Sequence, residues 1–303
     1  MFRKLVLILT VALLVASLFG CAGGGGDSKQ VAVGSKEFTE QLILGQIAIK
    51  ALEEHGFTVI DRTGLAGTEP ARVALENGEI DLYWEYTGTA WLVALGHDQP
   101  ITDSEEAYNK VKEEDAANGL IWLPYAPFDN TYTLMMRQED AQALGIVSLS
   151  DLAAYMAANP AELMVGIDHE FSARPDGWPE LIKVYGIDIP EENVSIMDLG
   201  ITYKALRDGQ VDVAMGFATD GRIAAFDLVN LEDDKHFFPV YNPSPVVRTE
   251  TLEKYPEIAD ILGDIGPSLD TETMTNLNYQ VDIEEREPEE VAEEWLRDKG
   301  FIE

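Results

Sequence analysis

Two aromatic residues, Tyr86 and Phe217, occupy the same place in two similar stretches of the chain. Residues 74–90 have the sequence ALENGEIDLYWEYTGTA, and residues 205–221, 131 positions later, have the sequence ALRDGQVDVAMGFATDG. In each stretch the aromatic residue follows an Asp by five positions. An aromatic ring attracts a cation to its face through the ring quadrupole, without a hydrogen bond. Two such rings in equivalent places could therefore form two walls of a cation site.

Each stretch has the pattern of a helix, a turn and a strand. Gly78 and Gly209 follow the helical segments, and glycine readily adopts the left-handed conformation that ends a helix. The apolar segments IDLYW and VDVAM follow as strands. Ligands of open α/β sheets bind outside the carboxyl ends of strands, so both aromatics would face a cleft. The alternative is that the stretches are alike only because helix-turn-strand units resemble one another wherever a parallel sheet is built.

Strands and helices alternate along the rest of the chain. Thr68 is expected to cap a helix that has Pro70 in its first turn, and Thr102 and Glu105 have the spacing of a capping box. This alternation predicts an α/β fold with parallel sheets covered by helices. Strands are expected at 30–36, 57–61, 80–84, 163–168 and 211–215, and helices at 37–56, 67–78, 102–119, 178–186, 202–209 and within 249–303.

The first twenty residues form a separate segment. Arg3 and Lys4 precede an apolar run that is too short for a comfortable membrane span but typical of a signal peptide. The run ends in LFGC, a lipobox that predicts cleavage before Cys21 and lipid attachment to its thiol. Residues 21–30 would then be a flexible tether. The chain has no other cysteine, so we expect neither a disulfide framework nor a cysteine nucleophile.

The charge of the chain is strongly negative. Of 303 residues, 55 are Asp or Glu and 21 are Lys or Arg, which gives a formal net charge of −34, while a hydrophobic content of 46% is enough for one large or two medium cores. An acidic surface disfavours binding to nucleic acid and to anionic membranes. No calcium-loop motif is present. A solvated surface suited to a salty exterior is the simplest interpretation.

Catalytic motifs are missing from the sequence. His55, His97, His169 and His236 lie far apart, without the spacing of paired metal ligands, and there is no nucleophile elbow or phosphate-binding loop. We therefore expect no catalytic residues, no metal and no cofactor. The alternative, an exported hydrolase or transferase on a two-lobed scaffold, would have to turn over a bound substrate.

Six motifs carry a resemblance to a known family: GSKEFTEQLILGQI, GEIDLYWEYTGT, FDNTYTL, EFSARPDGWPEL, TDGRI and LEDDKHFFPVYNPSPVVR, in this order. Over residues 31–302 the chain resembles the substrate-binding proteins of osmoprotectant ABC importers, which capture glycine betaine, choline, carnitine and related compounds. The resemblance implies a type II periplasmic-binding fold, in which two α/β lobes joined by two crossover strands close on a ligand. Lobe 1 would comprise residues 31–130 and 241–303, and lobe 2 residues 131–240.

The resemblance also implies a set of ligand-binding residues. A trimethylammonium group has no N–H, so aromatic faces must hold it. The matching positions of the cage are Tyr86, Tyr132, Phe217 and Tyr241. Relatives often have tyrosine where this chain has Phe217, and phenylalanine keeps the ring face without the hydroxyl.

Other matching positions would hold the rest of the ligand. Arg174 matches the arginine that binds the carboxylate of a betaine, for which a guanidinium offers a planar pair of donors; the alternative is an ion pair with one of the many acids. Asn130, Gln41 and Thr68 are further candidates for polar contacts, and some relatives have Asp at the position of Asn130.

The expected function is that of an extracytoplasmic, lipid-anchored binding protein. It would act as a monomer that captures a quaternary ammonium osmolyte and delivers it to a membrane permease with a cytoplasmic ATPase, without binding nucleic acid. The alternative within the same fold is an amino acid or polyamine ligand, which would favour converging carboxylates over aromatic rings.

Overall fold

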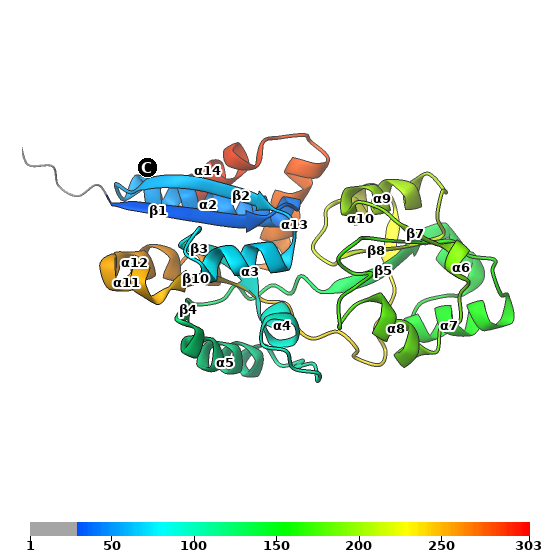
Figure 1. Ribbon diagram of the computed structural model, residues 1–303. Helices are drawn as coiled ribbons and strands as arrows, with labels where there is room; N and C mark the ends of the chain where they lie inside the picture. The colour runs from blue at the N-terminus through cyan, green and yellow to red at the C-terminus, as the bar shows by residue number, and fades with distance from the viewer. Residues whose placement is uncertain (1–28) are drawn as a thin grey trace, which may run out of the picture.

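The computed structural model describes residues 29–303, which form two five-stranded sheets with helices on both faces of each (Figure 1). The predicted signal peptide, Cys21 and most of the predicted tether lie outside the described residues. Within residues 29–303 no helix is both long and apolar enough to cross a membrane.

The first sheet combines strands from both ends of the described chain. Its strands, in spatial order, are β2 (Thr58–Leu65), β1 (Gln30–Lys36), β3 (Leu82–Tyr86), β10 (Pro243–Arg248) and β4 (Leu120–Trp122). β1 runs parallel to β2 and β3, whereas β10 is antiparallel to both β3 and β4. The chain therefore returns to this sheet after building the second one.

The second sheet repeats the same pattern. Its strands, in spatial order, are β7 (Val194–Ile196), β6 (Val165–Ile167), β8 (Val213–Phe217), β5 (Tyr132–Arg137) and β9 (Leu228–Asn230). β6 runs parallel to β7 and β8, and β5 is antiparallel to β8 and β9. β8 thus holds the place in this sheet that β3 holds in the first. The two repeated stretches of sequence build equivalent strands, and Gly78 (φ 74°) and Gly209 (φ 71°) end the helices before them.

Helices cover both faces of both sheets. In the first sheet Leu82 and Trp84 of β3 pack with the apolar face of α2, whereas Tyr83 points to the opposite core with Leu75 and Trp122. This alternation along one strand explains why β3 carries large apolar residues on both of its faces. The helices are α2 (Thr39–Glu54), α3 (Thr68–Glu76), α4 (Thr87–Thr89), α5 (Ser104–Asp115), α6 (Gln138–Leu144), α7 (Leu149–Ala158), α8 (Trp178–Tyr185), α9 (Leu199–Arg207), α10 (Arg222–Ala225), α11 (Thr249–Lys254), α12 (Glu257–Gly263), α13 (Thr271–Asp282) and α14 (Pro288–Lys299).

Two segments connect the sheets, residues 123–131 before β5 and residues 231–242 before β10. The two segments lie side by side and are joined by a hydrogen bond, in which the Asn130 backbone N–H donates to the Tyr241 carbonyl at 3.1 Å. α13 extends from the first half to the second, where the backbone of Tyr279 lies against Gly221. The exact lobe boundaries at 130/131 and 240/241 stay a prediction.

Two predicted helix caps are wrong in detail. Gly67 rather than Thr68 precedes α3, and Thr68 is the first helical residue, which leaves its hydroxyl for a longer-range contact. At α5 the carboxylate of Asp103, not the side chain of Thr102, accepts from the backbone N–H of Glu106 at 2.8 Å. Both misplacements are by one residue: at α5 the neighbouring polar residue Asp103 takes the cap, and at α3 the cap position is held by Gly67, which has no side chain to accept a hydrogen bond.

Candidate functional site

A cavity of about 900 Å³ lies between the two halves and is lined by residues of both, a size typical of small-molecule sites. Of the predicted ligand-binding residues, it is lined by Thr68, Tyr86, Asn130, Tyr132, Arg174, Phe217 and Tyr241. The structure therefore brings these predicted residues together from segments more than 100 positions apart.

Strand pairing places four aromatic side chains at the cavity. In the first sheet Tyr86 ends β3 and pairs with Pro243 at the start of β10, so Tyr241 lies just beyond the same edge. In the second sheet Phe217 ends β8 and pairs directly with Tyr132 at the start of β5. Tyr86, Phe217 and Tyr132 thus come from the ends of strands, and Tyr241 comes from the connecting segment just before β10.

The rings contact one another around the cavity. The Tyr132 ring centroid lies 5.0 Å from that of Phe217 and 5.5 Å from that of Tyr241, to which it is nearly perpendicular at 86°. Phe38 completes the connection, with its centroid 5.1 Å from Phe217 and 6.2 Å from Tyr86. Burial raises the pKa values of Tyr86, Tyr132 and Tyr241 well above 10, so all three phenols are neutral and present uncharged π faces.

Phe38, Lys36 and Thr89 are among the cavity-lining residues that sequence reasoning did not find. Phe38 and Lys36 belong to the motif GSKEFTEQ, where β1 ends and α2 begins, and Thr89 lies in α4 just after β3. The Lys36 ammonium pairs with Glu85 at 2.8 Å and lies 5.4 Å from the Tyr86 ring centroid. The position of these residues after strand ends is the signal that could have revealed them.

Arg174 is a buried residue with all five of its N–H donors directed at protein acceptors. Nε and Nη2 form two hydrogen bonds with Asp176, at 2.7 and 2.6 Å, and Nη1 bonds to Glu170 at 2.9 Å. The remaining N–H groups reach the hydroxyls of Thr68 and Thr89 at 3.5 and 3.4 Å. A ligand carboxylate at Arg174 would therefore have to replace one of these partners, and its predicted role stays a prediction.

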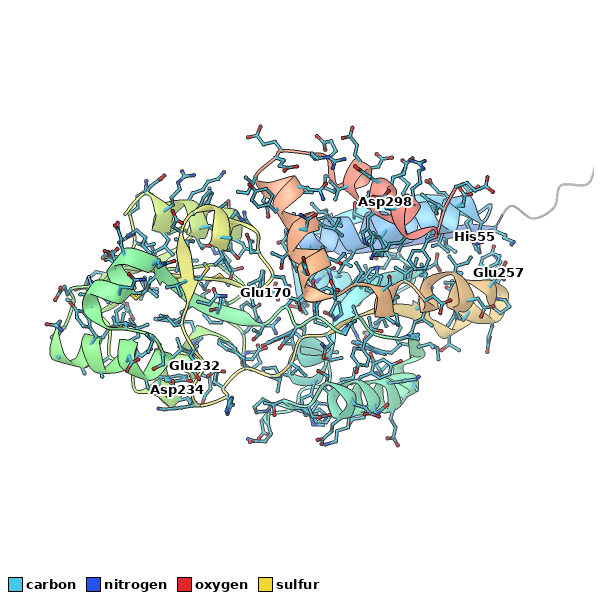
Figure 2. All side chains as sticks on the ribbon, turned by 180° about the vertical axis from the view of Figure 1, so that it is seen from behind. His55, Glu170, Glu232, Asp234, Glu257 and Asp298 are labelled. Atoms are coloured by element: carbon cyan, nitrogen blue, oxygen red, sulfur yellow. The ribbon has the colours of Figure 1, made fainter. Side chains whose placement is uncertain are left out.

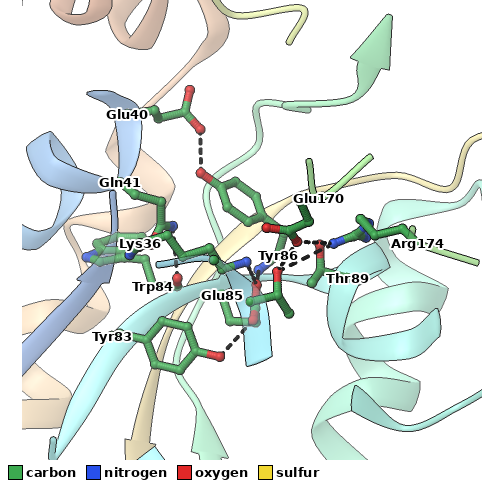
Figure 3. Close-up of polar contacts among 12 residues, drawn as sticks. Lys36, Glu40, Gln41, Tyr83, Trp84, Glu85, Tyr86, Thr89, Glu170 and Arg174 are labelled. Atoms are coloured by element: carbon green, nitrogen blue, oxygen red, sulfur yellow. Dashed lines mark hydrogen bonds and ion pairs between the residues drawn. The ribbon is translucent and has the colours of Figure 1, made fainter. Parts of the chain in front are cut away.

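Glu170 is the partner of Arg174 that a ligand could replace most easily, since its side chain is 31% exposed (Figures 2 and 3). It also accepts a hydrogen bond from Thr68 at 2.5 Å, which joins the second half to α3 of the first. Burial opposes the ionisation of Glu170, but the charges of Lys36 and Arg174, together with the hydrogen bonds from Thr68 and Arg174, outweigh it and lower its pKa. The carboxylate of Glu170 thus occupies a site with the chemistry expected for the ligand's carboxylate.

Gln41 lies outside the cavity, contrary to its predicted place among the polar contacts of the ligand. Its side chain is fully buried and bonded to the backbone, accepting from the Lys36 N–H at 3.1 Å and donating to the Trp84 carbonyl at 2.9 Å (Figure 3). These bonds fix β1 against β3, so Gln41 supports the cavity wall from behind. Its position in the first turn of α2 indicates a polar role, but not the direction in which the amide points.

Acidic side chains are otherwise spread over the surface. Figure 2 shows Glu232, Asp234 and Asp298 at the outside of the molecule and Glu170 between its two halves. At the cavity, burial raises the pKa of Asp168 to about 6. Among residues 29–303 no three His, Cys, Asp or Glu side chains are arranged to hold a metal ion.

Comparison with known proteins adds family relationships to this geometry. Residues 29–298 match the model of the substrate binding domain of the ABC-type glycine betaine transport system. The chain is 40% identical to a glycine-betaine-binding protein of Pseudomonas aeruginosa, over 98% of this chain and 96% of the relative. It is 35% identical to a carnitine transport binding protein of Listeria monocytogenes, over 99% and 98% of the two chains.

Solved structures agree with the fold. A crystal structure described as a glycine betaine/carnitine/choline ABC transporter covers 90% of this chain and 100% of its own, with 31% identity and a TM-score of 0.73. The predicted type II periplasmic-binding fold with two lobes is confirmed. These matches extend over nearly the whole described chain, and the chain belongs to the family of substrate-binding domains of ABC-type glycine betaine transport systems.

Proposed function

We propose that this protein captures a quaternary ammonium osmolyte, such as glycine betaine, choline or carnitine, in an aromatic cage and delivers it to the membrane permease of an ABC importer with a cytoplasmic ATPase. The observation that carries the proposal is the convergence of Tyr86, Tyr132, Phe217 and Tyr241 on one cavity, from strand ends of both sheets and from the segment just before β10. Ring faces are the protein groups suited to a cation that has no N–H to donate.

The cage divides the ligand contacts between the two lobes. A ligand held by rings from both sheets binds the closed arrangement better than the open one and so shifts the population towards closure. Asn130, Thr68, Thr89 and Lys36 provide polar groups around the cage for the other end of the ligand. Family membership implies a permease partner, and we propose that the protein acts as a monomer.

Calorimetric titration tests the ligand class. Glycine betaine, choline and carnitine should each bind with measurable heat in high-salt buffer, because their trimethylammonium groups fit the cage. Ectoine, an amino acid and a polyamine, titrated in parallel, should bind far more weakly. Tight binding of the amino acid or polyamine, with no binding of the trimethylammonium compounds, would refute the proposal. Mass spectrometry after a long incubation should recover each ligand unchanged; a converted product would indicate an enzyme instead.

We also propose that Cys21 carries a lipid anchor that keeps the protein at the outer face of the cell membrane. The basis is the LFGC motif after an apolar run, followed by a glycine-rich tether. The Cys21→Ser variant should fold and be released from the membrane fraction, because the apolar run only directs export. Fractionation followed by immunoblotting checks this. A processed Cys21→Ser chain that stays with the membrane would contradict the anchor.

A further inference from the structure

A second polar cluster lies behind the cage around Glu40, whose own side chain does not line the cavity of about 900 Å³. Glu40 is the second residue of α2 and is only 3% exposed. Its carboxylate accepts from the Tyr86 hydroxyl at 2.7 Å, from the Thr219 hydroxyl at 2.6 Å and from the Asn278 amide at 3.2 Å. These partners come from β3, from the segment after β8 and from α13. One carboxylate therefore connects a cage ring of the first sheet to the second half (Figure 3 shows its bond to Tyr86).

The hydrogen bonds of the Thr219 hydroxyl depend on whether Glu40 is protonated or ionised. The Thr219 hydroxyl has one hydrogen but two acceptors, Glu40 Oε2 at 2.6 Å and Asn130 Oδ1 at 2.8 Å. A protonated Glu40 can donate to Thr219, which then donates to Asn130, so every contact has its hydrogen. An ionised Glu40 takes the Thr219 hydrogen and leaves the Asn130 oxygen without a donor from Thr219.

The electrostatic surroundings agree with a group that titrates near neutrality. Burial raises the pKa of Glu40 to about 7, and the hydrogen bonds from Thr219, Tyr86 and Asn278 only partly oppose this. Within residues 29–303 no ion pair joins Glu40 to a cation, because the nearby cations already have acidic partners. The charged groups of the elements packed around it are Lys36 with Glu85 on β1 and β3, Asp220 with Arg222 at α10, and Asp282 at the end of α13.

We propose that Glu40 is a positioning residue that orients Tyr86 through its hydroxyl, ties it to Thr219 across the two halves, and releases its proton to solvent when a quaternary ammonium ion docks on the ring. The inference rests on the proposed function. The incoming cation stabilises the carboxylate behind the ring, and the ionised carboxylate makes the ring a better partner for the cation. Ligand binding and deprotonation of Glu40 therefore favour each other.

The pH dependence of choline binding tests this coupling. Binding requires ionised Glu40, so the dissociation constant should be about tenfold larger at pH 6 than at pH 8, the limit for a group titrating at about 7. Titrations in phosphate and in Tris, which differ in ionisation enthalpy, should show about half a proton released for each choline bound at pH 7. Glu40→Gln should bind choline with less than about twofold change between these pH values and release no proton.

Matched variants separate Glu40 from other carboxyl groups. Asp168→Asn removes an acid of the cavity wall with a pKa of about 6 and should keep the proton release. Thr219→Val removes a hydrogen bond that lowers the pKa of Glu40, so it should shift the pH dependence of choline binding to higher pH.

The thermal stability of the ligand-free protein gives an independent readout. Because the pKa of folded Glu40 lies above its ordinary 4.5, its contribution to stability is lost as pH rises through 7, and the Tm of the wild type should fall relative to Glu40→Gln.

The possible results are distinguishable. Choline binding that is constant from pH 6 to 8 without proton release in the wild type overturns the inference, whether or not Glu40→Gln folds. Proton release that persists in folded Glu40→Gln overturns it as well. The absence of binding for every quaternary ammonium compound at both pH values would instead show that the proposed function is wrong.

Discussion

Replacing Arg174 with alanine should lower the free energy of unfolding by about 3–5 kcal/mol. Asp176, whose side chain is only 1% exposed, would lose both N–H donors of its ion pair and keep the Tyr241 hydroxyl at 2.6 Å. A buried carboxylate left without its cation is costly, because the one remaining hydrogen bond from Tyr241 does not replace the lost charge and the two lost N–H donors. Urea unfolding of the ligand-free protein measures this loss.

An exposed ion pair provides the control for Arg174. Arg297→Ala breaks a pair with Glu293 whose side chains are 54% and 38% exposed, so it should change stability by less than about 1 kcal/mol. Among ligands, Arg174→Ala should weaken glycine betaine more than choline, by roughly 1.5–3 kcal/mol, because only betaine has a carboxylate to lose a charged partner. If Arg174→Ala and Arg297→Ala have equal free energies of unfolding, the ion pair of Arg174 with Asp176 does not stabilise the fold. If Arg174→Ala lowers the affinity for glycine betaine and choline equally, Arg174 acts on closure and does not bind the ligand's carboxylate.

Replacing Tyr132 with leucine should weaken choline and glycine betaine alike, by on the order of 1–2 kcal/mol. Both ligands present the same trimethylammonium head, and leucine keeps an apolar side chain but has no ring quadrupole. Tyr132 is the central ring of the cage, in contact with Phe171, Phe217, Phe238 and Tyr241. Calorimetric titration of both ligands measures the change.

Tyr132→Phe is the matched control, because it keeps the ring face at the same position. It should bind both ligands nearly as well as the wild type. A truncation to alanine would add the cost of lost packing, of about 3–5 kcal/mol in the free energy of unfolding, and would confuse binding with stability. Unchanged binding in Tyr132→Leu would remove this ring from the cage, even with the family assignment intact.

The sequence predicted the features that depend on local pattern and on repetition. The repeated stretches indicated equivalent strand ends, and β3 and β8 are equivalent in their sheets, with Tyr86 and Phe217 at their ends. These strand ends pair with Pro243 and Tyr132, which are distant in the sequence. Hydrophobic periodicity does not predict such long-range pairing, and only the resemblance to a known family placed Tyr132 and Tyr241 at the same site. Helix caps were misplaced by one residue because glycine and short polar residues next to each other are all acceptable at the cap position.

The polar part of the site was harder to predict, because it depends on the directions of buried side chains. Arg174 has Glu170 four residues before it and Asp176 two residues after it, a spacing that allows an ion pair but does not require one. Gln41 and Glu40 are neighbours in the first turn of α2, yet one holds β1 against β3 and the other reaches Tyr86 and Thr219. A glutamate in a first helical turn is usually explained by the helix dipole, so its burial could not be foreseen.

The most direct test of the cation cage compares choline with 3,3-dimethyl-1-butanol, which has the same shape but a neutral carbon in place of the nitrogen. If aromatic faces bind the charge, calorimetric titration should give choline at least about tenfold higher affinity, equivalent to roughly 1.4 kcal/mol. Equal affinities for the two compounds would show that the cavity recognises apolar shape alone, and would contradict the cage.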